Sequence, residues 1–458
     1  PPRGPEADFG HFEWGYGDES APQLIHRLPD GDIIASGGGS IISPPPPKYE
    51  GEPTRPMRGR VGAWLALRDE AGWKALTFID PPDQIDAQNV PSDFGRADVV
   101  TRLADGTIVV AGALATDDTN ARHDLAGYGP DLTVRWSMDL PGDARRFTRI
   151  RTTVNGDIVL VGGVLNSSGY AGMFITRLSG ASAASAPSVA SDLSISEAER
   201  PTTTDIIAAI GADGRVALVG PARIGVDLGD GPLTAETGSE LVVVSYDPDG
   251  EVLWHRLFDG DGVADVALGP EGEIAFGGIL YRNANFGQGP LVAYESQSRW
   301  AGFVVKLSAD GQSQWSHRVG GPEGVGVHGI AVDDFGNVTA VGALGKTFET
   351  GGASFRTRGQ QFIAVQFNVS GRPLWGRTNY VSPFIPRRVS ADEAGDLTMS
   401  GEGGPYIGFG DGAVDLRFEA LTKARSNAPF QGTYVARFRG AGALGPSAGG
   451  PDGPTVGM

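Results

Sequence analysis

A short pattern of glycines and apolar residues recurs seven times along the chain. In each copy a glycine is followed by apolar residues two and four positions later and by a second glycine six positions later. Alternating apolar positions are typical of a strand with one buried face, and a glycine before them supplies the positive φ of a hairpin turn. The copies predict seven hairpins of strands a and b, whose first glycines are Gly31, Gly106, Gly156, Gly214, Gly272, Gly336 and Gly395.

A second hairpin follows the first in most copies. It begins with an apolar run such as residues 303–307 or 362–367, continues through a turn, and ends in a strand that opens on Trp315 or Trp375. These segments predict strands c and d, so each copy holds four strands. Successive first glycines stand 50 to 75 residues apart, and no helical period separates the strands. Such units are typical of propeller blades and unlike alternating β/α units.

The two ends of the chain complete the pattern. The seventh copy ends with a c strand at residues 433–438 and has no Trp strand after it, whereas residues 12–18 have the form of the d strand at 253–259. We therefore predict an all-β fold, a single closed seven-bladed β-propeller with four antiparallel strands per blade. The N-terminal strand, residues 11–18, completes the last blade and removes the free sheet edges.

The predicted domain spans residues 1–445, followed by a flexible Gly/Pro tail at residues 446–458. The predicted blades cover residues 19–80, 95–141, 146–197, 200–259, 262–320, 325–380 and 384–440.

Three stretches, residues 223–260, 302–321 and 336–380, resemble the bacterial seven-bladed β-propeller repeats of the SBBP type. The shared features are a DGxGNVYVTG-like first hairpin and an IFVAKLDxxGxxLWSKxFGG-like second hairpin. The chain departs from this consensus in the third blade, which has no Trp, and in the first, where Leu76 takes the Trp position. The resemblance implies an extracytoplasmic protein, secreted, periplasmic or on the cell surface, and it implies no common catalytic residues.

Composition narrows the class of protein further. With 70 Gly and 32 Pro in 458 residues the chain is close to low complexity, but its 40% apolar content suffices for a folded core. The net charge of −18, with no basic stripe, argues against nucleic acid as a partner. The absence of Cys excludes disulfides and thiolate chemistry.

The sequence also bears on location. No apolar run approaches the ~18 residues of a membrane span, so we expect a soluble protein. The start at Pro1, without Met or a signal pattern, leads us to expect numbering that begins after processing or at an artificial boundary. Export is the expected route.

The predicted b-to-c loops are long and varied, and loops on a rigid scaffold commonly carry recognition. Either these loops bind a partner or they are surface decoration without function. They cover residues 38–60, 116–125, 221–239, 279–301, 343–360 and 402–432.

Polar residues near the start of each strand a are predicted to line the mouth of a central channel. Three carboxylates, two guanidinium groups and an imidazole converging there would suit a polar ligand or a cation. The alternative is a solvated channel without a ligand. The candidates are Gln23, Asp98, Arg149, Asp205, Asp265, His328 and Arg387.

The tryptophans fall into two groups. Those at the fixed position of strand d are expected to pack blades together, namely Trp14, Trp136, Trp254, Trp315 and Trp375. Trp64, Trp73 and Trp300 fall outside this register. Because Trp300 stands in a long loop, we take it as the candidate for stacking on a ligand.

Metal and catalytic motifs are poorly supported. Residues 259–265 resemble part of a calcium loop but lack the distal bidentate Glu, and an inter-blade turn is the better explanation of them. We therefore expect no cofactor, with calcium as the open alternative. The GxGxxG at residues 324–329 and the Lys346-Thr347 pair lack the helix that nucleotide binding needs. No GxSxG motif or Ser, His and Asp triad is recognisable.

The sequence thus predicts a non-enzymatic, exported binding or scaffold propeller that presents its b-to-c loops to a protein or glycan partner. Two alternatives stay open. One is a propeller lyase or hydrolase that uses the channel-mouth residues. The other is a structural subunit of a surface or filament assembly, in which the chain associates with itself.

Overall fold

The computed structural model describes 22 segments of the chain. All the regular elements in these segments are β-strands. None of the described segments forms a helix that is long and apolar enough to cross a membrane. The segments are residues 7–11, 22–27, 33–37, 64–69, 72–78, 96–115, 122–142, 145–166, 169–196, 206–221, 225–234, 240–260, 262–293, 300–320, 324–344, 347–356, 361–378, 384–391, 397–403, 406–408, 413–415 and 432–438.

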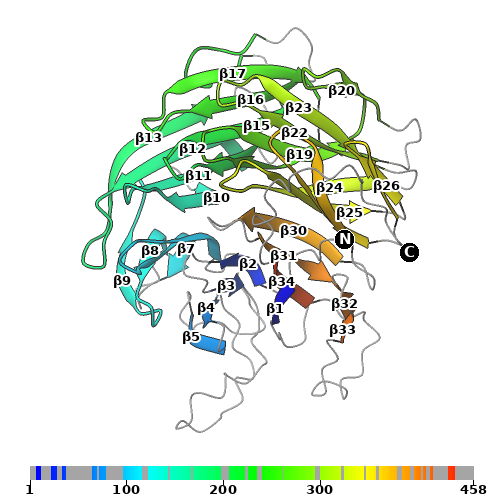
Figure 1. The fold of residues 1–458 in the computed structure, drawn as a ribbon. Helices are drawn as coiled ribbons and strands as arrows, with labels where there is room; N and C mark the ends of the chain where they lie inside the picture. Colours follow the sequence, from blue (N-terminus) through cyan, green and yellow to red (C-terminus); the bar gives the residue numbers. More distant parts are fainter. Residues whose placement is uncertain are drawn as a thin grey trace. The chain divides into compact units, whose positions relative to one another are not determined.

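The chain divides into two compact units, and the first, Phe12–Asp259, contains four antiparallel meanders of consecutive strands. Each meander follows the predicted order a, b, c and d (Figure 1). The strands are β2 (Pro22–Arg27), β3 (Ile33–Gly37), β4 (Trp64–Asp69), β5 (Gly72–Phe78), β6 (Arg96–Arg102), β7 (Ile108–Ala115), β8 (Arg122–Tyr128), β9 (Val134–Met138), β10 (Arg145–Thr152), β11 (Ile158–Asn166), β12 (Gly169–Ser179), β13 (Ser188–Ser196), β14 (Ile207–Ile210), β15 (Val216–Pro221), β16 (Glu240–Tyr246) and β17 (Val252–Asp259).

The second unit, Pro1–His11 with Gly260–Met458, contains three further four-stranded sheets and short hairpins in its b-to-c loops. The sheet orders are β18-β19-β22-β23, β24-β25-β28-β29 and β1-β34-β31-β30. The strands are β1 (Ala7–His11), β18 (Val263–Leu268), β19 (Ile274–Leu280), β20 (Ala284–Asn285), β21 (Pro290–Leu291), β22 (Ala301–Leu307), β23 (Ser313–Val319), β24 (Val325–Val332), β25 (Val338–Leu344), β26 (Thr347–Thr350), β27 (Ala353–Arg356), β28 (Gln361–Phe367), β29 (Pro373–Thr378), β30 (Phe384–Ala391), β31 (Leu397–Gly403), β32 (Tyr406–Gly408), β33 (Ala413–Asp415) and β34 (Gly432–Phe438).

These meanders confirm the all-β fold and the four antiparallel strands in each repeat. The N-terminal strand does pair with the last c strand, as β1 lies antiparallel to β34. Its position differs from the prediction, however, because the paired strand is Ala7–His11 and overlaps the predicted 11–18 at His11 alone. Residues 12–18 lie outside the described segments. The first and third repeats also have d strands, β5 and β13, without a Trp at the fixed position. In β5 the register places Ala75 at that position, not Leu76 as predicted, and Trp73 lies two residues earlier.

The first glycine of the repeat is required by the turn between strands a and b. Gly106, Gly156, Gly214, Gly272 and Gly336 all have positive φ, between 74° and 93°. A side chain at such φ strains the backbone, whereas glycine adopts it without penalty. Gly31 and Gly395 lie outside the described segments.

The second glycine is required by a β-bulge in strand a. Six of the seven sheets have a bulge there, in which one extra residue of strand a is left without a partner on strand b. The second glycine pairs with the residue just before the extra one, as Gly278 does with Val263. A Cβ on Gly278 would lie 1.9 Å from the carbonyl oxygen of Gly262. The repeated glycine thus permits a close backbone approach.

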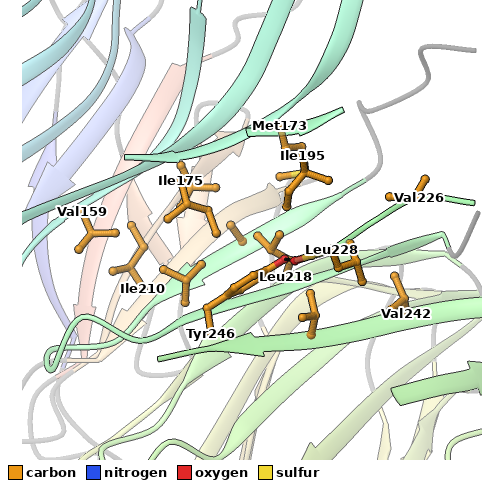
Figure 2. Close-up of a cluster of buried hydrophobic side chains, with 14 of the residues drawn as sticks. Val159, Met173, Ile175, Ile195, Ile210, Leu218, Val226, Leu228, Val242 and Tyr246 are labelled. Atoms are coloured by element: carbon orange, nitrogen blue, oxygen red, sulfur yellow. Dashed lines mark hydrogen bonds between the residues drawn. The ribbon is translucent and has the colours of Figure 1, made fainter. Parts of the chain in front are cut away.

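Consecutive sheets within each unit bury their apolar faces against one another. In the first unit, Val159 and Ile175 of the β10–β13 sheet pack with Ile210 and Leu218 of the next sheet (Figure 2). Tyr246 is fully enclosed, and its hydroxyl donates to the carbonyl oxygen of Leu228 at 2.8 Å. In the second unit, a similar cluster joins the β18–β23 and β24–β29 sheets.

Tryptophans of strand d add hydrogen bonds between neighbouring sheets. Trp136 Nε1 donates to the carbonyl oxygen of Ser182 at 2.9 Å, and Trp315 Nε1 donates to that of Val369 at 3.0 Å. Each acceptor lies in the c-to-d turn of the next sheet. The expected packing role is therefore confirmed for these two tryptophans, and Trp14 lies outside the described segments.

Cationic side chains of strand c link neighbouring sheets in a similar way. Arg177 donates to the carbonyl oxygen of Gly214 at 2.8 Å, and Lys306 donates to that of Gly336 at 2.7 Å. Both acceptors are first glycines of the following repeat. Burial lowers the pKa of Lys306, although Glu273, 3.5 Å from its Nζ, acts in the opposite direction.

His317 gives the fold a predicted dependence on pH. Its ring stacks on Trp315 and on Phe367 at 26° to each, and Nε2 donates to the carbonyl oxygen of Gly371 at 2.6 Å. Burial lowers the pKa of His317, although the hydrogen bond to Gly371 favours the protonated ring. The folded chain therefore holds this imidazole neutral further into acid than the unfolded chain does.

We expect the free energy of unfolding to decrease as the pH falls from about 6.5 towards the lower folded-state pKa of His317. In that window the unfolded chain binds the proton more tightly, so protonation favours unfolding. Denaturant titrations of the parent chain and of His317→Phe, which keeps an aromatic ring, measure the effect. The variant should lose part of this decrease, and an equal decrease in both chains would contradict a neutral, buried His317.

Candidate functional site

Two large aromatic side chains are exposed together at one end of the β18–β23 sheet. Tyr281 follows β19 and Trp300 precedes β22, and the last ladder partners before them are Leu280 and Ala301. Continuing this register places Tyr281 opposite Trp300, one step beyond the ladder. Their ring centroids are 6.5 Å apart at an interplanar angle of 73°. Tyr281 and Trp300 are called the aromatic pair below.

The exposure of the aromatic pair distinguishes it from the other aromatic residues. Tyr281 is 61% exposed and Trp300 is 51% exposed, whereas Leu280 and Ala301 are buried. Among the residues whose burial the structure describes, Phe335 is the other exposed large aromatic residue, and it lies in the a-to-b turn of another sheet. Aromatic rings usually pack into cores or interfaces, so two adjoining exposed rings indicate a contact surface.

The aromatic pair rests on an ordered backbone. Gly262 has a φ of 69°, and its carbonyl oxygen accepts a hydrogen bond from Ile279 N at 2.8 Å. A Cβ on Gly262 would lie 2.0 Å from the carbonyl oxygen of Ile279 and 3.0 Å from Cε2 of Tyr281. The glycine therefore lets the start of strand a pass directly beside the Tyr281 ring.

The loop that joins the two aromatic residues is itself anchored to the sheet. Phe286 is fully buried and stacks on Phe303 with ring centroids 4.9 Å apart. Asn283 Oδ1 accepts from the backbone of Ala293 at 2.9 Å, and Gln288 Nε2 donates to the carbonyl oxygen of Ser313 at 2.7 Å. These contacts give residues 281–293 a defined conformation beside the aromatic pair.

Two of the predicted channel-mouth carboxylates hold neighbouring sheets together. Asp98 Oδ2 accepts from the backbone N of Phe147 at 3.2 Å, and Asp265 Oδ2 accepts from the backbone N of Ile330 at 2.9 Å. In both cases the acceptor is near the bulge of strand a, and the donor is in strand a of the next sheet. Asp265 is 8% exposed. This geometry supports a structural role for both groups.

The remaining channel-mouth candidates are only partly described. The unpaired bulge residues are Gln23, Asp98, Thr148, Ala264, His328 and Arg387, so Arg149 and Asp265 each stand one position beyond the bulge. Arg149 donates to the carbonyl oxygen of Thr148 at 3.0 Å. His328 is half-buried and lies beside Gly326. Asp205 lies outside the described segments, as do the side chains of Gln23 and Arg387.

A buried ion pair in the β10–β13 sheet is satisfied internally. Arg145 donates to both carboxylate oxygens of Asp192, at 3.0 and 2.7 Å, and also to Thr176 and to the carbonyl oxygen of Pro141. Its guanidinium group lies 4.5 Å from the centre of the Phe174 ring. Because these partners all belong to the chain itself, we assign Arg145 a structural role and not a ligand-binding one.

The described residues do not assemble a metal centre. No group of three or more potential His, Asp or Glu ligands occurs among them. Of the proposed calcium segment at residues 259–265, Asp261 lies outside the described part, and Asp265 is hydrogen-bonded to Ile330.

Comparison with known proteins gives a similarity of fold at low identity. No family model matches the chain, and no curated protein sequence matches it. An ulvan lyase, a polysaccharide lyase solved with a bound saccharide, is 14% identical, with 86% of this chain and 92% of that chain covered and a TM-score of 0.42. A puromycin hydrolase mutant is 12% identical, with 85% and 59% covered and a TM-score of 0.38.

A gluconolactonase-like protein of known structure is 11% identical, with 76% of this chain and 93% of that chain covered and a TM-score of 0.31. Similarity at this level assigns no activity to the chain. The functional argument therefore depends on the chain's own residues.

Proposed function

We propose that the protein is a non-enzymatic binding module that recognises a carbohydrate through the b-to-c loop of the β18–β23 sheet. The observation that carries this proposal is the aromatic pair, Tyr281 and Trp300, which is exposed at the root of an anchored loop. The apolar C–H face of a sugar ring stacks on such side chains, while their O–H and N–H groups suit the hydroxyl groups around it.

The surroundings of the aromatic pair favour a glycan over a protein partner. A stable protein interface buries an apolar core within a contact of about 800 Å² on each side. Within the described part of the loop, residues 281–293, the exposed polar side chains are Asn283, Asn285 and Gln288, and the exposed apolar ones besides Tyr281 are Pro290 and Val292. Two rings set among amide side chains suit a small amphipathic ligand.

A binding role also agrees with the carboxylates that the structure describes near the bulges. A general acid or nucleophile needs a carboxyl group that can reach the substrate. The Asp98 and Asp265 carboxylates accept backbone hydrogen bonds from the neighbouring sheet instead.

A lyase or hydrolase is the second candidate. The bulges of strand a favour it, because bulges redirect side chains and are common next to active sites. The extra residue is polar at Asp98, Thr148 and His328. In a lyase or hydrolase, these polar residues would contact the substrate.

We further propose that the seven sheets are the blades of one closed propeller, with β1 as the fourth strand of the last blade. The pairing of β1 with β34 and the face-to-face packing of consecutive sheets within each unit support this arrangement.

Trp300→Ala is expected to weaken glycan binding about fivefold to tenfold, since loss of one stacked ring removes about 1 to 1.5 kcal/mol. A glycan array probed with labelled protein identifies the ligand, and calorimetric titration then measures the dissociation constant. Phe335→Ala is the matched control, because Phe335 is as exposed as Tyr281, at 61%, but lies in an a-to-b turn.

Equal binding by Trp300→Ala and the parent protein would contradict the proposed site. Chromatography of the same mixtures distinguishes the binding module from the enzyme, because a lyase or hydrolase releases shorter glycans during incubation. Product release that is lost in His328→Ala would establish the second candidate in place of the first.

A further inference from the structure

The relative orientation of Tyr281 and Trp300 indicates whether the bound glycan is a flexible chain or a flat crystalline surface. This inference rests on the proposed function. The two rings meet edge to face, at 73° and with centroids 6.5 Å apart. They cannot form one flat platform in this arrangement. A planar array of sugars can lie flat on one ring and then meets the other ring only at its edge.

The backbone places the two rings beside each other. The two residues are at opposed positions just beyond the Leu280–Ala301 pair of the ladder. The Tyr281 ring lies beside Gly262, where even a Cβ would come within 3.0 Å of its Cε2. Rotating Tyr281 into the plane of Trp300 would give up the edge-to-face contact that aromatic rings favour.

We propose that the aromatic pair binds a soluble, twisted glycan chain at two consecutive sugar units, and that the face of a crystalline polysaccharide can stack on only one of the two rings. One sugar stacks on the Trp300 ring. The next sugar turns about the glycosidic bond, as free chains in solution can do, and presents its face to Tyr281. In a crystal the packed neighbours hold successive sugars in one plane, so the second contact is lost.

The pair therefore acts as a sensor of chain conformation. Both rings contribute to a soluble chain of two or more sugars, whereas a single sugar contacts one ring fully. A flat crystal face offers no more than the single contact.

The test uses the full chain, together with Trp300→Ala, Tyr281→Ala and the control Phe335→Ala. The probes are soluble oligosaccharides of the sugar that the array identifies, from one unit upwards, measured by calorimetric titration. Microcrystalline cellulose and crystalline chitin are used as powders in sedimentation assays. Circular dichroism confirms that each variant is folded.

The proposal expects affinity to rise at least about tenfold from one sugar unit to two. Tyr281→Ala should abolish this gain, Trp300→Ala should weaken binding at every length, and Phe335→Ala should change neither. Sedimentation with either powder should be the same for Tyr281→Ala as for the parent chain, because a flat face gains nothing from the second ring.

Trp300-dependent binding to a crystalline powder, with no gain from a second soluble unit, would overturn this inference while leaving carbohydrate binding intact. The absence of Trp300-dependent binding to any glycan, soluble or crystalline, would overturn both the inference and the proposed function.

Discussion

Gly278→Ala is expected to lower the free energy of unfolding by more than about 3 kcal/mol, because the site has no room for a methyl group. The added Cβ would lie 1.9 Å from the carbonyl oxygen of Gly262 and 2.8 Å from Cα of Val263. Both obstacles are backbone atoms at the bulge of strand a, so a change of side-chain rotamer cannot relieve the clash. Denaturant titration followed by far-UV circular dichroism measures the loss.

Gly106→Ala provides the matched control. Gly106 has a φ of 84°, but a Cβ there would meet nothing within 4 Å. Its substitution is expected to cost only the backbone strain of a left-handed residue, about 1 kcal/mol. If the two variants lost equal stability, the close approach at the bulge would not be the reason for the second glycine of the repeat.

Asp192→Ala is expected to destabilise the chain by about 3 to 5 kcal/mol, since it leaves the buried Arg145 guanidinium group without its carboxylate. The Arg145 side chain is 4% exposed, and its Nη2 lies 2.7 Å from Asp192 Oδ2. Asp139→Ala is the control, because Asp139 pairs with His123 while its own side chain is 66% exposed. A surface pair of this kind contributes at most about 1 kcal/mol.

The same ion pair should appear in the acid dependence of stability. Burial alone would raise the pKa of Asp192, but hydrogen bonds from Arg145 and Thr176 outweigh it and hold the pKa below the usual value. A depressed carboxyl pKa stabilises the fold above the unfolded-state pKa, and the contribution disappears as the pH falls through the folded-state pKa. A buried pair would be contradicted if Asp192→Ala and Asp139→Ala lost equal free energy of unfolding. It would also be contradicted if the decrease in stability at acid pH were the same in Asp192→Ala as in the parent chain.

The repeat pattern predicts most of the fold, because the features that it records are local. The first glycines mark turns with positive φ, and the alternating residues after them mark strand b. The sequence predicts the N-terminal strand too late in the chain, because the Trp14 segment resembles a d strand. Its partner on β34 is instead Ala7–His11, and such pairing depends on contacts with residues far along the chain.

The bulges explain why two of the channel-mouth candidates predicted from the sequence are one position away from the unpaired bulge residue. A bulge adds one unpaired residue without altering the apolar pattern on either side. Alignment from the turn therefore selected Arg149 and Asp265, where the unpaired residues are Thr148 and Ala264. The hydrogen bonds of Asp98 and Asp265 to the next sheet also lie beyond a sequence pattern, because their partners are more than 45 residues away.

The sequence identifies one of the two residues of the candidate site. Trp300 is recognisable because it falls outside the position of the d-strand tryptophans. Tyr281 carries no comparable mark, and its role depends on being opposite Trp300 beyond the ladder. Extending the register of β19 and β22 by one position would have identified it as the partner.

A crystal structure of the protein with the oligosaccharide selected on the array would show where the glycan binds. We expect one sugar ring stacked on Trp300 and the next against Tyr281, at the end of the β18–β23 sheet. An oligosaccharide bound elsewhere, with both rings left uncovered, would contradict the proposed site.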